Sequence, residues 1–342
     1  MTTPRDRFVN LQIVVPCFDE EAMLPEAARQ LDALLARMVD SGAISAESRV
    51  NFVDDGSRDN TWTLIEREAA SRSRVAGIRL SRNRGHQNAV LAGLLSVGGD
   101  AVVSIDADLQ DDVDAIERMV AEFRDGCDVV YGVRTDRSSD SRFKRGTASV
   151  FYRGLARFGV ELVHNHADFR LLSRRAVEAL REYREVNLYL RGVIPLIGFR
   201  QTSIGYVRKA RFAGESKYPF RKMWALAVDA ITSFSTAPLQ VIFVAGFIVF
   251  LGSIGVFAWV LWVTLFTGRA VPGWASTLLP MLFLGGIQIL CTGVIGAYLG
   301  KVYAEIKARP RYFIDRTVGV TGPAPASSRD AVGSARADAP HD

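Results

Sequence analysis

Short apolar runs alternate with longer amphipathic or polar stretches over the first 132 residues of the chain. Five of these runs predict buried strands, at Leu11–Val15, Val50–Val53, Val75–Leu80, Ala101–Ile105 and Asp128–Tyr131. Between them, apolar residues recur at helical spacing, which predicts helices over 21–39, 89–97 and 113–123. Strands separated by helices predict an α/β domain with a mainly parallel central sheet and right-handed crossovers.

From Pro238 onward the pattern changes to long apolar segments. Neither Leu239–Phe266 nor Val271–Gly300 contains a charged residue, and each exceeds the roughly 20 residues that a membrane-spanning helix needs. A buried helix of a soluble domain is the alternative, which such length disfavours. Arg269 is the only charged residue between the two segments, whereas several basic residues precede and follow them. We therefore expect a protein of the plasma (inner) membrane with both ends in the cytoplasm.

The pattern therefore predicts five parts: a cytoplasmic α/β domain (1–218), a juxtamembrane interfacial helix (219–236), two transmembrane helices (237–303), a cytoplasmic basic and aromatic segment (304–318) and a disordered tail (319–342). For the juxtamembrane helix, packing between domains is a nearly equal alternative. The arginine-rich region 137–211 is expected to be helical over 144–158 and 174–183 and to form part of the site wall.

Composition narrows the class of partner. The net charge is +5, and the arginines follow no nucleic-acid motif with interleaved aromatic residues, so phosphate groups and anionic lipid are expected partners and nucleic acid is not. The cysteines, Cys17, Cys127 and Cys291, lie far apart, which favours a reducing compartment over a zinc site or a disulfide framework. The polar first ten residues predict no signal peptide.

An Asp-x-Asp pair, Asp106 and Asp108, follows the fourth predicted strand, at the sheet edge where α/β proteins bind ligands. Carboxylates that leave coordination positions for substrate phosphates suit Mg²⁺ or Mn²⁺ better than Zn²⁺. Taken alone, such a pair is equally typical of a solvated loop or a helix cap.

Acidic residues also follow the first two predicted strands, in 16–21 and 54–59. A nucleotide needs acceptors for its base and its ribose hydroxyls. Asp55 suits the base, and Glu20 suits the ribose or the base edge. A capped turn explains Ser57 and Asp59 equally well.

Taken together, these motifs resemble the family 2 glycosyltransferases with the GT-A fold, and among them the polyisoprenyl-phosphate hexosyltransferases, such as bactoprenol glucosyltransferases and dolichyl-phosphate mannose synthases. The resemblance covers nearly all of Leu11 to Phe313. Its most specific parts are Ala-Asp-Phe-Arg-Leu-Leu at 167–172, Arg-Phe-Ala-Gly-Glu-Ser-Lys-Tyr at 211–218 and Ala-Arg-Pro-Arg-Tyr-Phe at 308–313.

The resemblance implies a nucleotide-sugar site with Mg²⁺ or Mn²⁺. Its residues would be Pro16, Phe18, Glu20, Asp55, Asp106, Ala107, Asp108, Gln110, Arg211 and Lys217, with Asp106, Asp108 and Gln110 around the metal. The chain departs from the family pattern at Cys17, Phe18 and Asp19, where a small residue, Tyr and Asn are frequent, and at Val113, where Pro is usual. No metal ligand is lost, but Phe18 lacks the hydroxyl through which a Tyr at this position could form a hydrogen bond.

The resemblance also implies an acceptor-phosphate pocket of Arg134, Arg145 and Ser149. A lipid monophosphate has a second pKa of about 6 and is largely ionised near neutral pH, so its attack needs no strong general base. Direct displacement then inverts the anomeric centre. Asp168 is expected to position the sugar or Arg170; proton abstraction is the minority alternative, and a purely structural partner of Arg170 is the third.

The expected function is transfer of one hexose from a nucleotide sugar, with UDP preferred, to undecaprenyl or a related polyprenyl phosphate. The resemblance suggests a homotetramer. A processive polysaccharide synthase is an alternative, but its Gln-x-x-Arg-Trp motif is missing from the sequence. A non-catalytic membrane scaffold is the other alternative, which the intact acidic and basic motifs disfavour.

Overall fold

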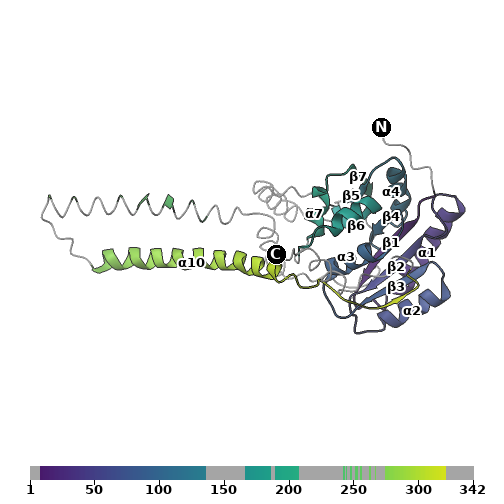
Figure 1. Ribbon diagram of the computed structural model, residues 1–342, viewed down its shortest axis with the longest axis horizontal. Helices are drawn as coiled ribbons and strands as arrows, with labels where there is room; N and C mark the ends of the chain where they lie inside the picture. The colour runs from purple at the N-terminus through teal and green to yellow at the C-terminus, as the bar shows by residue number, and fades with distance from the viewer. Residues whose placement is uncertain are drawn as a thin grey trace, which may run out of the picture. The chain divides into compact units, whose positions relative to one another are not determined.

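The computed structural model describes residues 8–135, 166–185, 189–207 and 274–320, with scattered positions between 242 and 266. The described strands form one sheet in the order β7-β5-β6-β4-β1-β2-β3-β8 (Figure 1). Their bounds are β1 Leu11–Cys17, β2 Arg49–Asp54, β3 Val75–Leu80, β4 Ala101–Ser104, β5 Val129–Arg134, β6 His166–Ser173, β7 Gln201–Tyr206 and β8 Ile314–Val318. The sheet is mixed, with β1, β2, β3 and β4 mutually parallel.

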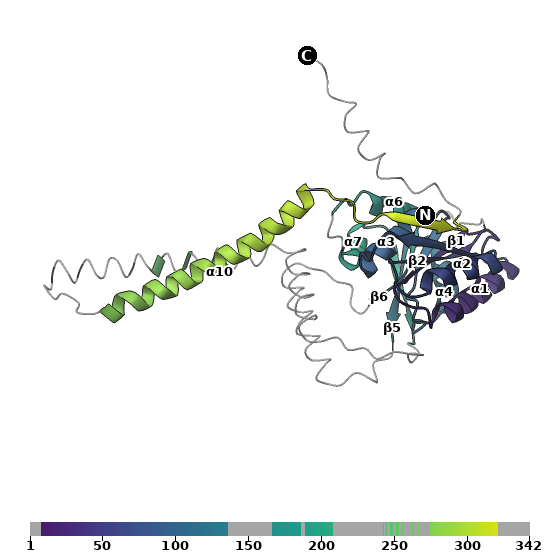
Figure 2. The ribbon, with the colours of Figure 1, turned by 90° about the horizontal axis from the view of Figure 1, so that it is seen from below.

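Helices cover both faces of this sheet (Figure 2). The described helices of the sheet-containing unit are α1 Leu24–Asp40, α2 Thr61–Ser71, α3 His86–Ser96, α4 Ala115–Arg124, α6 Arg174–Arg181 and α7 Leu190–Leu196. The α1, α2 and α4 helices pack on one face, and α3 and α6 pack on the other. Because both faces are covered, every residue of β1 is buried, which explains why the strand is apolar apart from Gln12.

Close packing of α3 on β1 depends on a glycine. A Cβ atom at Gly93 would lie 2.3 Å from Cγ1 of Val14, well inside van der Waals contact. The glycine therefore lets the helix backbone approach the strand. On the opposite face, Ile13 and Val15 of β1 join the main core cluster with Leu31 and Leu34 of α1.

The five predicted strands and the helices expected near 21–39, 89–97, 113–123 and 174–183 are confirmed, with ends shifted by a few residues. Three strands were not predicted. The β6 strand inserts antiparallel between β4 and β5, β7 pairs parallel with β5, and β8 pairs antiparallel with β3. The sheet is therefore less uniformly parallel than strand–helix alternation alone predicts.

The register of β4 and β6 determines the position of the candidate site. Ser104 at the end of β4 pairs with Arg170 in β6, and the Ser104 hydroxyl donates a 2.6 Å hydrogen bond to the Asp168 carbonyl. Antiparallel pairing therefore brings Asp168 beside Asp106, at the edge where the parallel strands have their carboxyl ends.

Helix α10 belongs to a second compact unit, whereas the described residues 309–320 group with the sheet. Helix α10, Trp274–Ile306, covers the second predicted apolar segment. Among the described residues, no helix combines the length and apolarity required to cross a membrane. The predicted helix over 144–158, the juxtamembrane segment 219–236 and most of the first apolar segment lie outside the described residues. The two transmembrane helices stay a prediction.

Candidate active site

The loop after β4 carries the predicted metal ligands. The Asp106 side chain is 35% exposed, while Gln110 is buried, and the Gln110 backbone N–H donates to Oδ1 of Asp108 at 3.2 Å. Between these ligands, Leu109 has a φ of +51°. A branched apolar residue rarely adopts this left-handed conformation, so the loop stores backbone strain beside the Asp-x-Asp pair.

The donor set of this loop fits a hard divalent cation. Burial raises the pKa of Asp106 to about 6; His86 opposes this rise, and the carboxylates of Asp111 and Asp168 add to it. This excess of negative charge is what a bound cation would neutralise. Within the described ranges, no three His, Cys, Asp or Glu side chains form a metal-binding group. One or two carboxylates together with substrate phosphates are the usual ligands of Mg²⁺ in nucleotide sites, and Asp106 and Asp108 offer two carboxylates.

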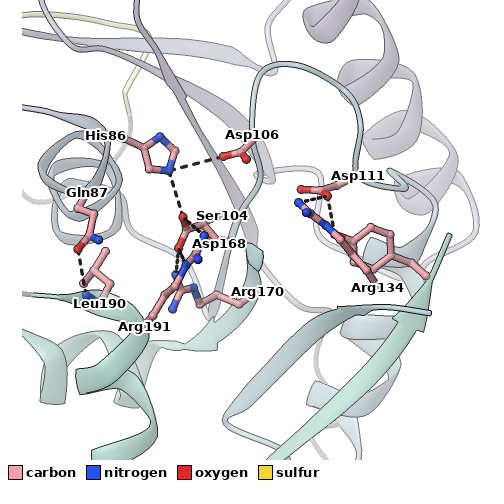
Figure 3. A network of polar contacts seen from close by, with 11 residues as sticks. His86, Gln87, Ser104, Asp106, Asp111, Arg134, Asp168, Arg170, Leu190 and Arg191 are labelled. Carbon is pink, nitrogen blue, oxygen red and sulfur yellow. Dashed lines mark hydrogen bonds and ion pairs between the residues drawn. The ribbon is translucent and has the colours of Figure 1, made fainter. Parts of the chain in front are cut away.

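Asp168 lies at the centre of a cluster of basic groups (Figure 3). Arg191 donates from Nε to Oδ1 at 3.1 Å and from Nη2 to Oδ2 at 3.0 Å, and the fully buried Arg170 donates from Nη2 to Oδ1. Burial by itself would raise the pKa of Asp168, but the His86 hydrogen bond and the charges of Arg170 and Arg191 lower it far below its usual range. Asp168 is therefore a stable anion.

His86, at the start of α3, joins the Asp168 cluster to the metal loop. Its Nε2 atom lies 3.4 Å from Oδ2 of Asp168 and 3.6 Å from Oδ1 of Asp106 (Figure 3). Burial lowers the pKa of His86, but the hydrogen bond to Asp168 and the charge of Asp106 outweigh this effect and raise it. The imidazole therefore links two carboxylates that are distant in sequence.

Asp55, predicted to contact the nucleotide base, is buried beneath the turn that precedes α3. Its two carboxylate oxygens accept backbone hydrogen bonds from Arg84 at 2.7 Å and Gly85 at 2.8 Å. Gly85 has a φ of +89°, which glycine adopts without strain. In this structure Asp55 supports the turn that positions His86, and its contact with a base stays a prediction.

The remaining nucleotide-site residues of the first loop lie at the same edge of the sheet. Pro16 pairs with Val53 in β2, Phe18 is 40% exposed, and the Glu20 backbone N–H donates to the Thr61 hydroxyl at 2.9 Å. Ser57 and Asp59 serve as turn caps, since Ser57 accepts from the Asp19 backbone and Asp59 accepts from the Thr61 and Glu21 backbones.

Arg134, predicted to bind the acceptor phosphate, ends β5 beside the metal loop. Its Nε donates to the Tyr206 hydroxyl at 3.2 Å, and its Nη2 lies 3.7 Å from Oδ1 of Asp111. The Tyr206 hydroxyl in turn donates to the same Asp111 oxygen. Asp111 directly follows Gln110, so this cluster connects the metal loop to Arg134 (Figure 3).

Four predicted site residues lie outside the described residues: Arg145, Ser149, Arg211 and Lys217. Among described residues, sequence reasoning missed His86, Asp111, Arg191 and Tyr206. The signal for Asp111 was available, because it continues the acidic run after Asp108. Arg191 and Tyr206 had no local signal, since Tyr206 reaches the site through the pairing of β7 with β5, and Arg191 lies in α7, 23 residues after the Asp168 that it contacts.

Comparison with known proteins identifies the family. The model of Glycosyl transferase family 2 matches residues 12–181. The uncharacterized glycosyltransferase YkoT of Bacillus subtilis is 44% identical over 311 residues, which cover 89% of this chain and 91% of that protein. This chain belongs to glycosyl transferase family 2. It is a glycosyltransferase, and the resemblance seen in its motifs is confirmed.

Further relatives of this family 2 chain carry more specific names. The prophage bactoprenol glucosyl transferase homolog of Escherichia coli K12 is 38% identical over 312 residues, covering 90% of this chain and 99% of the relative. The bactoprenol glucosyl transferase of Shigella phage SfX is also 38% identical, with the same two coverages. A solved glucosyl-3-phosphoglycerate synthase from Mycobacterium tuberculosis, in complex with Mn²⁺, UDP-glucose and phosphoglyceric acid, has 17% identity and a TM-score of 0.41, covering 66% of this chain and 78% of that one.

Proposed function

We propose that this enzyme transfers a single hexose from a nucleotide sugar to a polyprenyl phosphate, undecaprenyl phosphate in particular, with inversion at the anomeric carbon. The observation that carries the proposal is the 38% identity to bactoprenol glucosyl transferases across 90% of the chain. The product would be a lipid-linked sugar donor for cell-envelope glycosylation. The nucleotide that we propose for the donor is UDP.

In this proposal, the metal loop binds the diphosphate of the donor. Asp106, Asp108 and Gln110 would hold Mg²⁺ or Mn²⁺, which when bound neutralises charge on the departing nucleoside diphosphate. The nucleotide itself would lie against Pro16, Phe18, Glu20 and Ala107, at the carboxyl ends of β1 and β4. Asp55 would act there through the turn at Gly85, which it holds in place.

In this proposal, the acceptor phosphate is bound by Arg134, Arg145 and Ser149. An ionised phosphate oxygen attacks the anomeric carbon in line with the leaving group, so the enzyme's main task is positioning. The low pKa of Asp168 supports a positioning role, because an efficient general base has a pKa near the working pH. Asp168 would orient the groups around the sugar and would not accept a proton.

Membrane attachment is part of the same proposal. The uncharged segments Leu239–Phe266 and Val271–Gly300 support a pair of membrane helices that keep the catalytic domain at the cytoplasmic surface, where a lipid phosphate is presented. A homotetramer is proposed on the family resemblance alone.

The test is a transfer assay with the purified full-length chain. Radiolabelled nucleotide sugars are supplied one at a time with Mn²⁺ or Mg²⁺ and undecaprenyl phosphate, and we expect one donor to yield an organic-extractable product. The Asp108→Asn variant should fold normally and lose metal-dependent turnover by at least 100-fold or about 3 kcal/mol in transition-state stabilisation. Absence of product across the full donor panel would contradict the proposal, and full activity of Asp108→Asn would remove the metal assignment.

A further inference from the structure

We infer that Arg191 binds a phosphate oxygen of the substrates and that Asp168 orients it for this purpose. The inference rests on the proposed function and extends it to a residue outside every motif described above. The shared chemistry is a phosphate oxygen anion, which the donor diphosphate and the acceptor lipid phosphate both offer.

The first observation is how Arg191 is held. Its Nε and Nη2 atoms donate to the two oxygens of Asp168 at 3.1 and 3.0 Å, a bidentate arrangement that fixes the plane of the guanidinium. The backbone is fixed as well, because the Leu190 N–H donates to Oε1 of Gln87 in α3 at 3.2 Å. Leu190, Val193 and Ile194 are buried.

The second observation is exposure. The two arginines bound to Asp168 differ, since the Arg170 side chain is fully buried while the Arg191 side chain is 39% exposed. Asp168 therefore neutralises the buried guanidinium of Arg170 with one carboxylate oxygen and holds the accessible guanidinium of Arg191 with both oxygens. A guanidinium has five N–H donors in a planar fork that matches phosphate oxygens.

The third observation is position. His86 lies within 3.6 Å of both Asp106 in the metal loop and Asp168, so the Asp168 carboxylate and this imidazole connect Arg191 to the metal loop (Figure 3). Asp106, Asp108, Asp111 and Asp168 line this edge with negative charge. A substrate that brings phosphates to the same edge needs cationic partners besides the metal, and Arg191 supplies one.

The test compares Arg191→Ala and Arg191→Lys with the wild-type full-length protein in one binding measurement and one kinetic measurement. Calorimetry with UDP and Mn²⁺, in the absence of lipid, gives the donor-side Kd. Initial rates against undecaprenyl phosphate at saturating donor give the acceptor KM. Arg29→Ala is the matched control, because Arg29 makes the same bidentate contact, to Glu26, on the exposed face of α1.

We expect Arg191→Ala to raise one of these two constants by at least about tenfold, since hydrogen bonds to charged groups are the stronger ones. A rise in the UDP Kd assigns Arg191 to the diphosphate, and a rise in the acceptor KM assigns it to the lipid phosphate. Arg191→Lys should restore part of the affinity, because lysine keeps the positive charge but cannot reproduce the bidentate geometry. Arg29→Ala should change neither constant.

If Arg191→Ala lowers only the thermal midpoint and both constants stay within twofold of wild type, Arg191 is merely structural and the inference is wrong. A wild-type protein that binds UDP and forms product, with that result for the variant, leaves the proposed function intact. A wild-type protein that neither binds a nucleotide nor forms product refutes both.

Discussion

At the scale of single residues, Tyr206 makes an unusual number of interactions with the site. Its ring packs edge-to-face on Phe169 at 5.3 Å, its hydroxyl donates to Asp111, and it accepts from Arg134. Burial and the hydrogen bond to Asp111 raise the pKa of the Tyr206 hydroxyl, which therefore stays protonated. Tyr206 thus positions Arg134 relative to both the metal loop and the Asp-Phe-Arg motif.

Tyr206→Phe removes this hydroxyl and keeps the ring. Loss of hydrogen bonds to charged groups should cost about 1.5 kcal/mol in the positioning of Arg134, so the KM for polyprenyl phosphate should rise roughly tenfold. The Kd for the nucleotide should change less than twofold, because the ring still packs on Phe169. Equal losses in both constants would indicate a general structural defect and contradict the positioning role.

The ion pair of Asp168 and Arg170 leads to a prediction on how folding stability depends on pH. The lowered pKa of Asp168 stabilises the folded state above the ordinary carboxyl pKa of about 4, and this contribution is lost as the pH falls below that value. Asp168→Asn leaves Arg170 buried without a counter-charge and should lower the free energy of unfolding near neutral pH by about 3 kcal/mol.

The measurement is denaturant unfolding between pH 7 and pH 3. Stability of Asp168→Asn should depend less steeply on pH than that of wild type below pH ~4. The control is Asp114→Asn, which removes an exposed partner of Arg37 and should change stability little. A variant as acid-sensitive as wild type would show that Asp168 does not carry this linkage.

At the scale of elements, the contrast between predicted and missed strands follows from their environments. The strands β1 and β4 are buried on both faces and are apolar apart from Gln12 and Ser104, so their sequences are sufficient to predict them. By contrast, β7 and β8 lie at the two edges and are polar and largely exposed, and β6 contains the buried Arg170. An ion pair within the sheet and a solvated edge both break the apolar pattern on which prediction depends.

The same reasoning explains which parts of the site were predictable. Asp106 and Asp55 follow predicted strands directly, so their place at the sheet edge could be inferred. The antiparallel pairing of β6 with β4 brings Asp168 to His86, and Arg191 reaches Asp168 from α7; neither placement has a local sequence signature. The network around Asp168 is therefore a property of the fold and not of a motif.

Strand β8 supplies a prediction for an element. It pairs antiparallel with β3, its neighbour Phe313 accepts a hydrogen bond from the Ser81 N–H at 2.9 Å, and the Arg49 guanidinium donates to the Gly319 carbonyl at 2.8 Å. A truncation after residue 308 removes this cover and should lower the thermal midpoint by several degrees and increase aggregation through the exposed β3 edge.

The matched control for β8 is a truncation after residue 320, which keeps the strand and Gly319 and removes only the tail. It should leave the thermal midpoint and the transfer activity unchanged. If both truncations behave alike, β8 does not stabilise the sheet. Light scattering during heating would report the aggregation separately from the melting.

In the molecule as a whole, described residues on both sides of the apolar segments, up to 207 and from 309 to 320, belong to the sheet-containing unit. A folded unit lies on one side of a membrane. If the intervening segment spans a bilayer, it therefore crosses an even number of times, which agrees with the two predicted helices and with basic residues on both flanks.

This topology predicts the position of the connection between the two apolar segments. A reporter inserted between Thr267 and Gly273 should be extracytoplasmic, because that connection follows an odd number of crossings. Reporters at residue 8 and after residue 320 should both be cytoplasmic and serve as controls. A cytoplasmic signal from the connection would contradict the topology.

Transfer of one hexose to a lipid phosphate is the reaction that we propose for this family 2 enzyme. Mass spectrometry of the organic-extractable product, formed from undecaprenyl phosphate and the active nucleotide sugar, tests it most directly. We expect one species, the lipid phosphate carrying a single hexose, and no product when undecaprenyl phosphate is replaced by undecaprenol. A ladder of longer glycans, or equal transfer to undecaprenol, would contradict it.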